Sequence, residues 1–133
     1  MAETDWKVLI AEDNSVFANV MRLTLAKVGL QVTVAGDGAQ ALSALANDHF
    51  DLLITDEQMP HLSGHELCAR IRADQRLCDL PIFFCTAKGW EMNVAELKRE
   101  FGVQEVFIKP FSPRRLASAI TSFLEQHQAA LPV

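Results

Sequence analysis

The residues best suited to chemistry in this 133-residue sequence stand at the ends of short apolar runs. Glu12 and Asp13 follow one run, Asp56 and Thr86 end two others, and Lys109 ends a fourth. Such runs are typical of buried strands, and the carboxyl ends of parallel strands share the edge of a sheet where ligands bind. We therefore expect three carboxylates, one hydroxyl and one ammonium group to converge.

Charge repulsion limits what this cluster can do. Crowded carboxylates raise one another's pKa values unless positive charge lies nearby, and Lys109 leaves about two negative charges uncompensated. A divalent cation balances the set. Because all the candidate ligand atoms are oxygens and the site is small, the sequence favours Mg²⁺ over Ca²⁺.

A carboxylate beside a cation, an ammonium group and a hydroxyl suits phosphoryl transfer. The cation and Lys109 offset charge on the phosphoryl oxygens, the hydroxyl of Thr86 donates a hydrogen bond, and one of the carboxylates can attack phosphorus. Each residue alone is a weak signal, since an Asp at a strand end is usually solvated or a helix cap. The combination at matching strand ends is what indicates this chemistry.

The elements that position these residues alternate along the chain. Short apolar runs alternate with longer amphipathic segments, a pattern typical of a parallel sheet with crossover helices. The predicted strands are Lys7–Ala11, Gln31–Ala35, Leu52–Asp56, Pro81–Thr86 and Glu105–Lys109. All but the second have a continuous apolar centre, as strands buried on both faces do, whereas the second alternates and is predicted to be a half-exposed edge strand.

Capping signals mark the predicted helices. Ser63 and Glu66 form a capping box for Gly64–Ala73, and Ser112 precedes a proline at the first position of the last helix. Asp37 caps a helix to about Asn47, and the other helices are expected over Ser15–Val28 and Glu91–Phe101. The fold class is α/β: a doubly wound, flavodoxin-like, three-layer (βα)5 domain with strand order 2-1-3-4-5.

Composition bounds the class of protein. The length fits one domain over 1–133, with a core at about 7–127 and a tail or truncated linker at 128–133. The net charge of −5 argues against direct binding of nucleic acid, and no apolar run approaches the roughly 20 residues of a membrane span. Three unpaired-looking cysteines and the lack of a signal peptide favour a cytoplasmic location.

The order of these motifs resembles the receiver domain of bacterial two-component response regulators, of the stand-alone chemotaxis-regulator-like kind. The strings that carry the resemblance are VLIAEDN at 8–14, LITDEQMP at 53–60, SG at 63–64, CTA at 85–87 and FIKPF at 107–111. The resemblance covers roughly Lys7 to Phe123, and as a set these motifs are specific.

The resemblance implies the roles of the site residues. Asp56 is then the phosphoacceptor, taking a phosphoryl group from the phosphohistidine of a histidine kinase or histidine phosphotransfer protein. Asp13, Asp56 and the backbone carbonyl of Gln58 resemble direct ligands of Mg²⁺ (or Mn²⁺), and Glu12 resembles a second acid that acts through a metal-bound water. Lys109 is expected to contact the phosphoryl group.

A second set of residues resembles the family's switch. Thr86, followed by Ala87, is expected to turn toward the phosphoryl group, after which Phe107 swings inward. The Lys109–Pro110 peptide bond is expected to be cis. The interval from Thr86 to Lys109 is about one residue longer than usual in the family, in the Lys88–Glu91 loop.

The implied output is a surface on the fourth helix, fifth strand and fifth helix that binds a downstream protein, an output domain or a second copy of the chain. Phosphorylation-dependent dimerisation is left open, and neither nucleic acid nor a membrane is expected as a partner. The resemblance implies no enzyme beyond self-phosphorylation and slow self-dephosphorylation. The lifetime of the phosphorylated state is left open, because Gln58 and Lys88 stand where the family tunes it.

Other functions fit the sequence less well. An unphosphorylated scaffold with this fold would not need the full acidic set with Lys109. Hydrolases that form an aspartyl phosphate typically show Asp-x-Asp, whereas here Glu57 and Gln58 follow Asp56. A flavin-binding relative would need a phosphate loop where Glu12 and Asp13 stand.

Overall fold

A computed structural model describes residues 6–87 and 94–130. Five parallel strands form one sheet in the order β2-β1-β3-β4-β5. The strands are β1 Lys7–Ala11, β2 Gln31–Ala35, β3 Leu52–Asp56, β4 Ile82–Ala87 and β5 Glu105–Lys109. The helices are α1 Ser15–Lys27, α2 Gly38–Asn47, α3 Gly64–Ala73, α4 Val94–Phe101 and α5 Pro113–Ala130. This confirms the predicted doubly wound topology.

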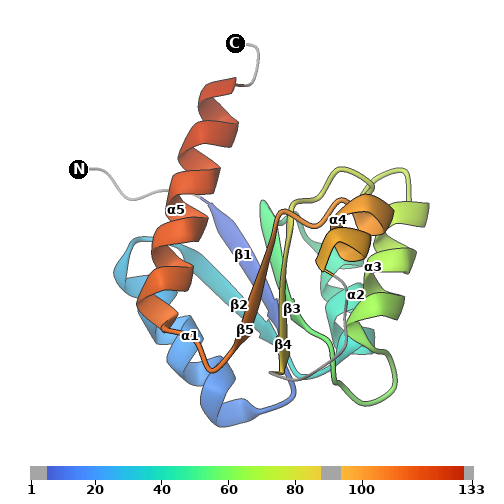
Figure 1. Ribbon diagram of the computed structural model, residues 1–133, viewed down its shortest axis with the longest axis horizontal. Helices are drawn as coiled ribbons and strands as arrows, with labels where there is room; N and C mark the ends of the chain where they lie inside the picture. The colour runs from blue at the N-terminus through green and yellow to red at the C-terminus, as the bar shows by residue number, and fades with distance from the viewer. Residues whose placement is uncertain (1–5, 88–93, 131–133) are drawn as a thin grey trace.

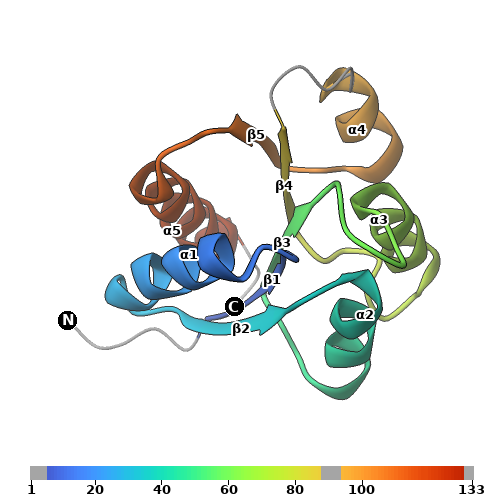
Figure 2. The same cartoon turned by 90° about the horizontal axis from the view of Figure 1, so that it is seen from below.

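The molecule has three layers. Helices α1 and α5 cover one face of the sheet, and α2, α3 and α4 cover the other (Figures 1 and 2). Each face has its own apolar core: Ile10 and Phe83 point toward α1 and α5, whereas Leu9 and Phe84 belong to the core on the opposite side. Because neighbouring residues of a strand point to opposite faces, β1, β3 and β4 are apolar throughout.

Local capping fixes where the helices begin beside the site. Asn14 accepts a hydrogen bond from the Phe17 backbone N–H and caps α1, and Asp37 caps α2 in the same way. Ser63 and Glu66 form the predicted capping box at the start of α3. These caps place the first turns of all three helices near the carboxyl ends of the strands.

Several predicted boundaries and one burial pattern were wrong. Strand β4 begins at Ile82, not Pro81, and ends at Ala87, while α1 ends at Lys27 with Val28 as its C-cap. Strand β5 is not buried on both faces, because it lies at the edge of the sheet and leaves Ile108 51% exposed. An apolar run indicates a strand, but it does not separate a central strand from an edge strand.

Part of the prediction lies outside the described residues. The Lys88–Glu91 loop and the expected start of the fourth helix at Glu91 fall in 88–93, so the described part of α4 begins at Val94. Helix α5 continues to Ala130, into the segment predicted as a tail. Among residues 6–87 and 94–130, no helix has the length and apolarity needed to cross a membrane.

Candidate functional site

Three carboxylates meet at the carboxyl edge of the sheet, as predicted. Oxygens of Glu12, Asp13 and Asp56 all lie within 4.8 Å of one another. Glu12 and Asp56 are buried and Asp13 is exposed, so the cluster opens to solvent on one side. The parallel register produces this convergence, because β1 and β3 are neighbours and end at the same edge.

Lys109 bridges the two buried carboxylates. Its Nζ lies 3.0 Å from Oε1 of Glu12 and 3.4 Å from Oδ1 of Asp56. The ammonium group also lies 4.7 Å from the centre of the Phe17 ring, within the range of a cation–π contact. Burial alone lowers the pKa of Lys109, but its bond to Glu12 and the charge of Asp56 raise it overall, so the ammonium form is retained.

The surroundings of Asp56 disfavour its charged form. Its side chain is only 8% exposed, and burial followed by repulsion from Glu12 raises its pKa from 3.8 to about 6. Attraction to Lys109 lowers this pKa but does not cancel the rise. Among residues 6–87 and 94–130, Lys109 is the ammonium group that pairs with Glu12 and Asp56, and its charge does not balance the three carboxylates, as the sequence predicted.

Thr86 lies near the end of β4, at the same sheet edge as this cluster. It is 4% exposed, and its Oγ1 has no hydrogen-bond partner among residues 6–87 and 94–130. A buried hydroxyl without a partner costs roughly 1–3 kcal/mol, so such groups are rare in folded proteins. The position of Thr86 on β4, next to Ile108 of β5 in register, places it at the same sheet edge as Lys109.

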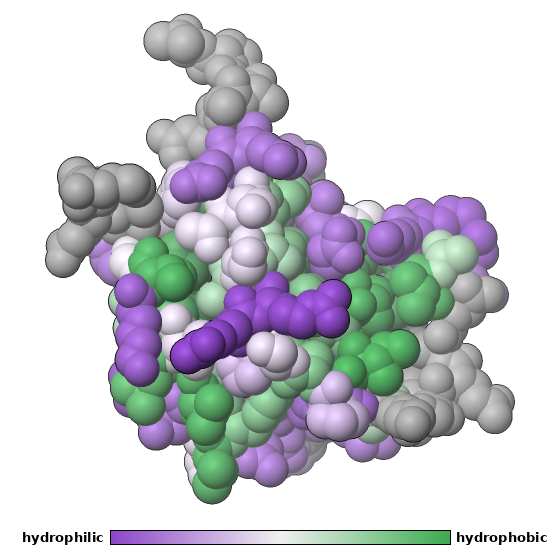
Figure 3. Space-filling view, turned by 60° about the vertical axis from the view of Figure 1, so that its left-hand side comes forward, coloured by the Kyte–Doolittle hydropathy of each residue, from purple (hydrophilic) through white to green (hydrophobic). Residues whose placement is uncertain are grey.

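Phe107 is half-buried on β5, where it was predicted to act as a switch. Its ring stacks on Phe83 at 6.1 Å and lies 5.4 Å from the ring of Phe111. A cavity of about 600 Å³ adjoins it between β5 and α5, lined among others by Ile108 and Arg115. Figure 3 shows the α5 side of the molecule, where apolar surface adjoins strongly hydrophilic side chains.

The loop after Asp56 is packed tightly against the start of α3. A Cβ atom added to Gly64 would lie 2.4 Å from the carbonyl oxygen of Asp56, so only glycine allows this approach. Gln58 is exposed in this loop, and metal binding by its carbonyl stays a prediction. Ala87 is exposed at the end of β4, and the Lys109–Pro110 bond is cis, as expected.

Three contributions to the site escaped the sequence reasoning. Glu57 is buried directly after Asp56, Phe17 lies under the Lys109 ammonium group, and the hydroxyl of Thr55 donates to the Asp56 carbonyl at 3.0 Å. The position of Glu57 between a buried strand and a helix cap was a usable signal. The Phe17 contact was not predictable, because it depends on how α1 packs over the edge of the sheet.

Comparison with known proteins identifies the family. The model of the family described as "Response regulator receiver domain" matches residues 8–121. The chain is 34% identical over 121 residues to the chemotaxis protein CheY of Pseudomonas aeruginosa, covering 90% of this chain and 97% of that protein. The chain belongs to the response regulator receiver domain family. Receiver domains act in two-component signalling, where they partner with kinases and output domains.

Other relatives are longer than this chain. It is 35% identical over 130 residues to the probable transcriptional regulator ycf27 of Guillardia theta, covering 96% of this chain and 49% of that protein. It is 30% identical over 126 residues to the regulator PhoP of Bacillus subtilis, covering 95% of this chain and 51% of that protein. The chain thus spans about half the length of the first curated relatives that it matches.

Solved structures agree on the fold. A response regulator from Chloroflexus aurantiacus superposes with a TM-score of 0.81 at 29% identity, covering 92% of this chain and 99% of that one. The receiver domain of the sensor histidine kinase PA1611 of Pseudomonas aeruginosa gives a TM-score of 0.80 at 26% identity, covering 92% of this chain and 99% of that one. That structure is described with a magnesium ion coordinated in its active site cleft.

The donor set fits the divalent cation that receiver domains typically bind. Glu12, Asp13 and Asp56 offer only oxygen ligands, as Mg²⁺ prefers, and their uncompensated charge favours a cation there. Asp13 is exposed, which leaves one side of the cluster accessible to an ion that keeps several waters.

Proposed function

We propose that Asp56 is the phosphoacceptor of this domain and that its phosphorylation switches a partner-binding surface. The observation that carries the proposal is the cluster of Glu12, Asp13 and Asp56 beside the ammonium group of Lys109. The hydroxyl of Thr86 at the same edge, which has no partner within the described part of the chain, supports the proposal, because a phosphoryl oxygen would supply an acceptor.

The proposed reaction is an in-line transfer from phosphohistidine. An Oδ atom of Asp56 attacks phosphorus and forms an acyl phosphate, while the nitrogen–phosphorus bond of the donor breaks. The imidazole nitrogen leaves with the bonding electron pair and takes up a proton. Lys109 moves its hydrogen bonds from the carboxylates to the phosphoryl group, and Thr86 donates to another phosphoryl oxygen.

Asp13, Asp56 and the Gln58 carbonyl are the proposed direct ligands of Mg²⁺ or Mn²⁺, with Glu12 acting through a water. When bound, this ion supplies the positive charge that the phosphoryl oxygens require. The magnesium-containing receiver domain of PA1611 supports this assignment.

The proposed phosphoryl donor is a histidine kinase or a histidine phosphotransfer protein. Helix α1 begins directly beyond Asp13 and Asn14, and it exposes Val16, Val20 and Leu23, which are spaced to share one face of the helix. An exposed apolar stripe beside the site suits a partner that must bring its phosphohistidine close to Asp56.

The proposed output surface is the face made by α4, β5 and α5. The 51% exposed Ile108, the half-buried Phe107 and the cavity beside them support it, since a ring that moves needs space next to it. An output domain, a separate protein or a second copy of this chain are the candidate occupants. We propose no enzymatic activity beyond self-phosphorylation and slow self-dephosphorylation, and the three free cysteines support a cytoplasmic location.

Phosphorylation with a small donor tests the proposal. Acetyl phosphate or phosphoramidate with Mg²⁺ is expected to add one phosphoryl group to the wild-type chain, measured by intact mass spectrometry. Asp56→Asn is expected to add none, and Asp51→Asn, at the opposite end of β3, is the matched control that should react normally. An adduct on Asp56→Asn, or none on the wild type, would refute the assignment.

A further inference from the structure

Glu57 is a buried carboxylate directly after the phosphoacceptor. It is 8% exposed, and its Oε1 accepts two hydrogen bonds from one residue, His65. The backbone N–H of His65 donates at 2.9 Å, and the ring nitrogen Nδ1 lies 3.0 Å away. Because a carboxylate oxygen is a hydrogen-bond acceptor, we assign the hydrogen of this contact to Nδ1.

The same glutamate is tied to α3 a third time. Its carbonyl oxygen accepts from the backbone N–H of Gly64 at 2.9 Å. Glu57 therefore satisfies two of the free N–H groups in the first turn of α3, and its charge lies at the positive end of that helix. These bonds join both ends of the loop between β3 and α3, which carries Gln58.

The ring of His65 is itself held in place by aromatic contacts. It meets the ring of Phe84 on β4 edge-on at 6.0 Å and that of Phe101, the last residue of α4, at 5.7 Å. Arg72 of α3 donates to the carbonyl of Phe101 at 2.6 Å, so α3 anchors the end of α4 at two points. A contiguous set of contacts thus runs from the residue beside Asp56 to α4.

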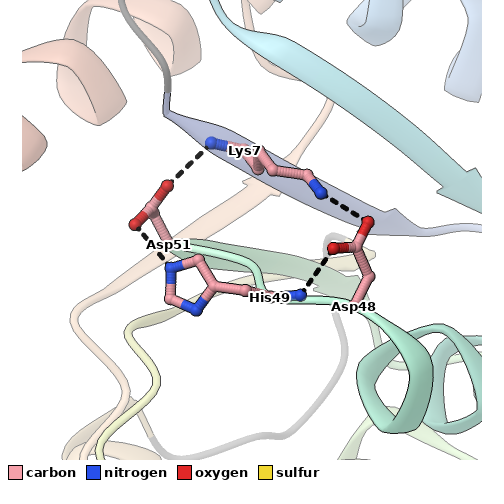
Figure 4. Close-up of polar contacts among 4 residues, drawn as sticks. All are labelled: Lys7, Asp48, His49 and Asp51. Atoms are coloured by element: carbon pink, nitrogen blue, oxygen red, sulfur yellow. Dashed lines mark hydrogen bonds and ion pairs between the residues drawn. The ribbon is translucent and has the colours of Figure 1, made fainter.

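A second histidine–carboxylate pair at the other end of β3 offers a natural comparison. His49 Nε2 lies 3.1 Å from Asp51 Oδ1, and Asp51 also accepts from the Lys7 backbone N–H (Figure 4). The His49 side chain is 78% exposed, whereas that of His65 is 38% exposed. The two pairs share their chemistry, but only His65 pairs with the residue directly after Asp56.

We propose that His65 is a positioning residue for the site, acting through Glu57. By fixing the Glu57 side chain against α3, it holds the backbone from Asp56 to Gln58 in the conformation that presents their oxygens to the cation. The proposal rests on the function proposed for Asp56, and it concerns residues outside the acidic cluster itself. Partners that orient metal ligands in this way typically change metal affinity when they are removed.

Two substitutions separate the hydrogen bond from the ring packing. His65→Phe keeps a ring for Phe84 and Phe101 but loses the Nδ1 donor, while His65→Asn keeps a donor near that position and loses the ring. Mg²⁺ affinity, measured by calorimetric titration, is expected to fall about tenfold in His65→Phe and to stay near wild type in His65→Asn. The rate of phosphorylation by phosphoramidate at fixed sub-saturating Mg²⁺ should follow the same order.

Matched controls distinguish positioning from general stability. His49→Phe removes the corresponding donor from the distant pair and should leave Mg²⁺ affinity unchanged. In a Glu57→Gln background, His65→Phe should have a much smaller effect than in the wild type, because both substitutions break the same contact. Urea unfolding of each variant shows whether it is folded during the titration.

Each outcome decides the proposal. Equal Mg²⁺ affinity and phosphorylation rate in wild type and His65→Phe would overturn the positioning role while leaving the phosphoacceptor assignment intact. Equal losses in His65→Phe and His65→Asn would assign the effect to the ring and also overturn it. A wild-type chain that neither binds Mg²⁺ nor accepts a phosphoryl group would refute both the function and the inference.

Discussion

Replacing Asp56 by asparagine removes a buried charge that destabilises the folded state. Burial and repulsion from Glu12 raise its pKa from 3.8 to about 6, and the attraction to Lys109 is already included in that value. At 1.36 kcal/mol for each pKa unit, the ionised form destabilises the folded state by roughly 3 kcal/mol. Asp56→Asn should therefore raise the free energy of unfolding at pH 7, by about 1–3 kcal/mol once burial of the amide is allowed for.

The pH dependence follows from the direction of the pKa change. Because the folded-state pKa of Asp56 lies above the unfolded value, the folded state binds the proton more tightly. The cost is complete above about pH 6 and disappears as the pH falls toward 4. The advantage of Asp56→Asn over the wild type should accordingly shrink between pH 7 and pH 4.

Urea unfolding in the presence of a chelator provides the measurement. Asp13→Asn removes one carboxylate from the same cluster at an exposed position, and we expect a smaller gain in stability. Saturating Mg²⁺ should stabilise the wild type by linkage and reduce or reverse the advantage of Asp56→Asn. A metal-free Asp56→Asn variant that is less stable than wild type at pH 7, or whose advantage does not change with pH, would refute the electrostatic reasoning.

Three further substitutions test other parts of the site. Gly64→Ala should destabilise the fold by about 1–3 kcal/mol and slow phosphorylation, because the added Cβ would lie 2.4 Å from the Asp56 carbonyl oxygen. Gly36→Ala is the control in the unfolding measurement, because its added Cβ would meet only the flexible Gln40 side chain. Equal losses of stability in the two variants would contradict this account. Lys109→Met should bind Mg²⁺ more tightly, since a competing positive charge is gone, yet accept phosphoryl groups more slowly. Calorimetry should therefore show a gain in Mg²⁺ affinity, and mass spectrometry a loss in the rate of phosphorylation. A loss of both affinity and rate would argue against both roles of Lys109. Thr86→Val should leave the unphosphorylated fold equally stable or about 1 kcal/mol more stable, because the lost hydroxyl has no partner in the described chain. The same substitution should abolish the changes in the NMR chemical shifts of β5 on phosphorylation. A marked loss of stability would contradict the absence of a hydrogen bond to this hydroxyl.

The strands and the acidic cluster were predictable from sequence for a common physical reason. Central strands of a parallel sheet are apolar on both faces, so the polar residue that ends each run marks the sheet edge. Once Leu52–Asp56 and Lys7–Ala11 were recognised as such strands, the meeting of Glu12 with Asp56 followed from topology alone. Side-chain detail had no part in that step.

What escaped prediction depends on packing between elements that are distant in sequence. Ile108 lies in an apolar run yet is 51% exposed, because only the tertiary structure places β5 at an edge. The partner of Glu57 is eight residues away, across a loop, and the ring of His65 is held by β4 and α4. A pattern of residue types along one segment does not contain these contacts.

Two unfavourable features of the site are each relieved by a different ligand. Burial and repulsion from Glu12 raise the pKa of Asp56, and among residues 6–87 and 94–130 the hydroxyl of Thr86 has no acceptor. A bound cation would offset the charge at Asp56, and a phosphoryl oxygen would accept a hydrogen bond from Thr86. The two features therefore have separate explanations. Folded proteins tend to break the rules of charge pairing and hydrogen bonding where they function, and here both exceptions lie at one edge of the sheet. Because a cation alone leaves Thr86 without an acceptor, metal binding is expected to relieve Asp56 without moving the switch, and only the phosphoryl group engages both.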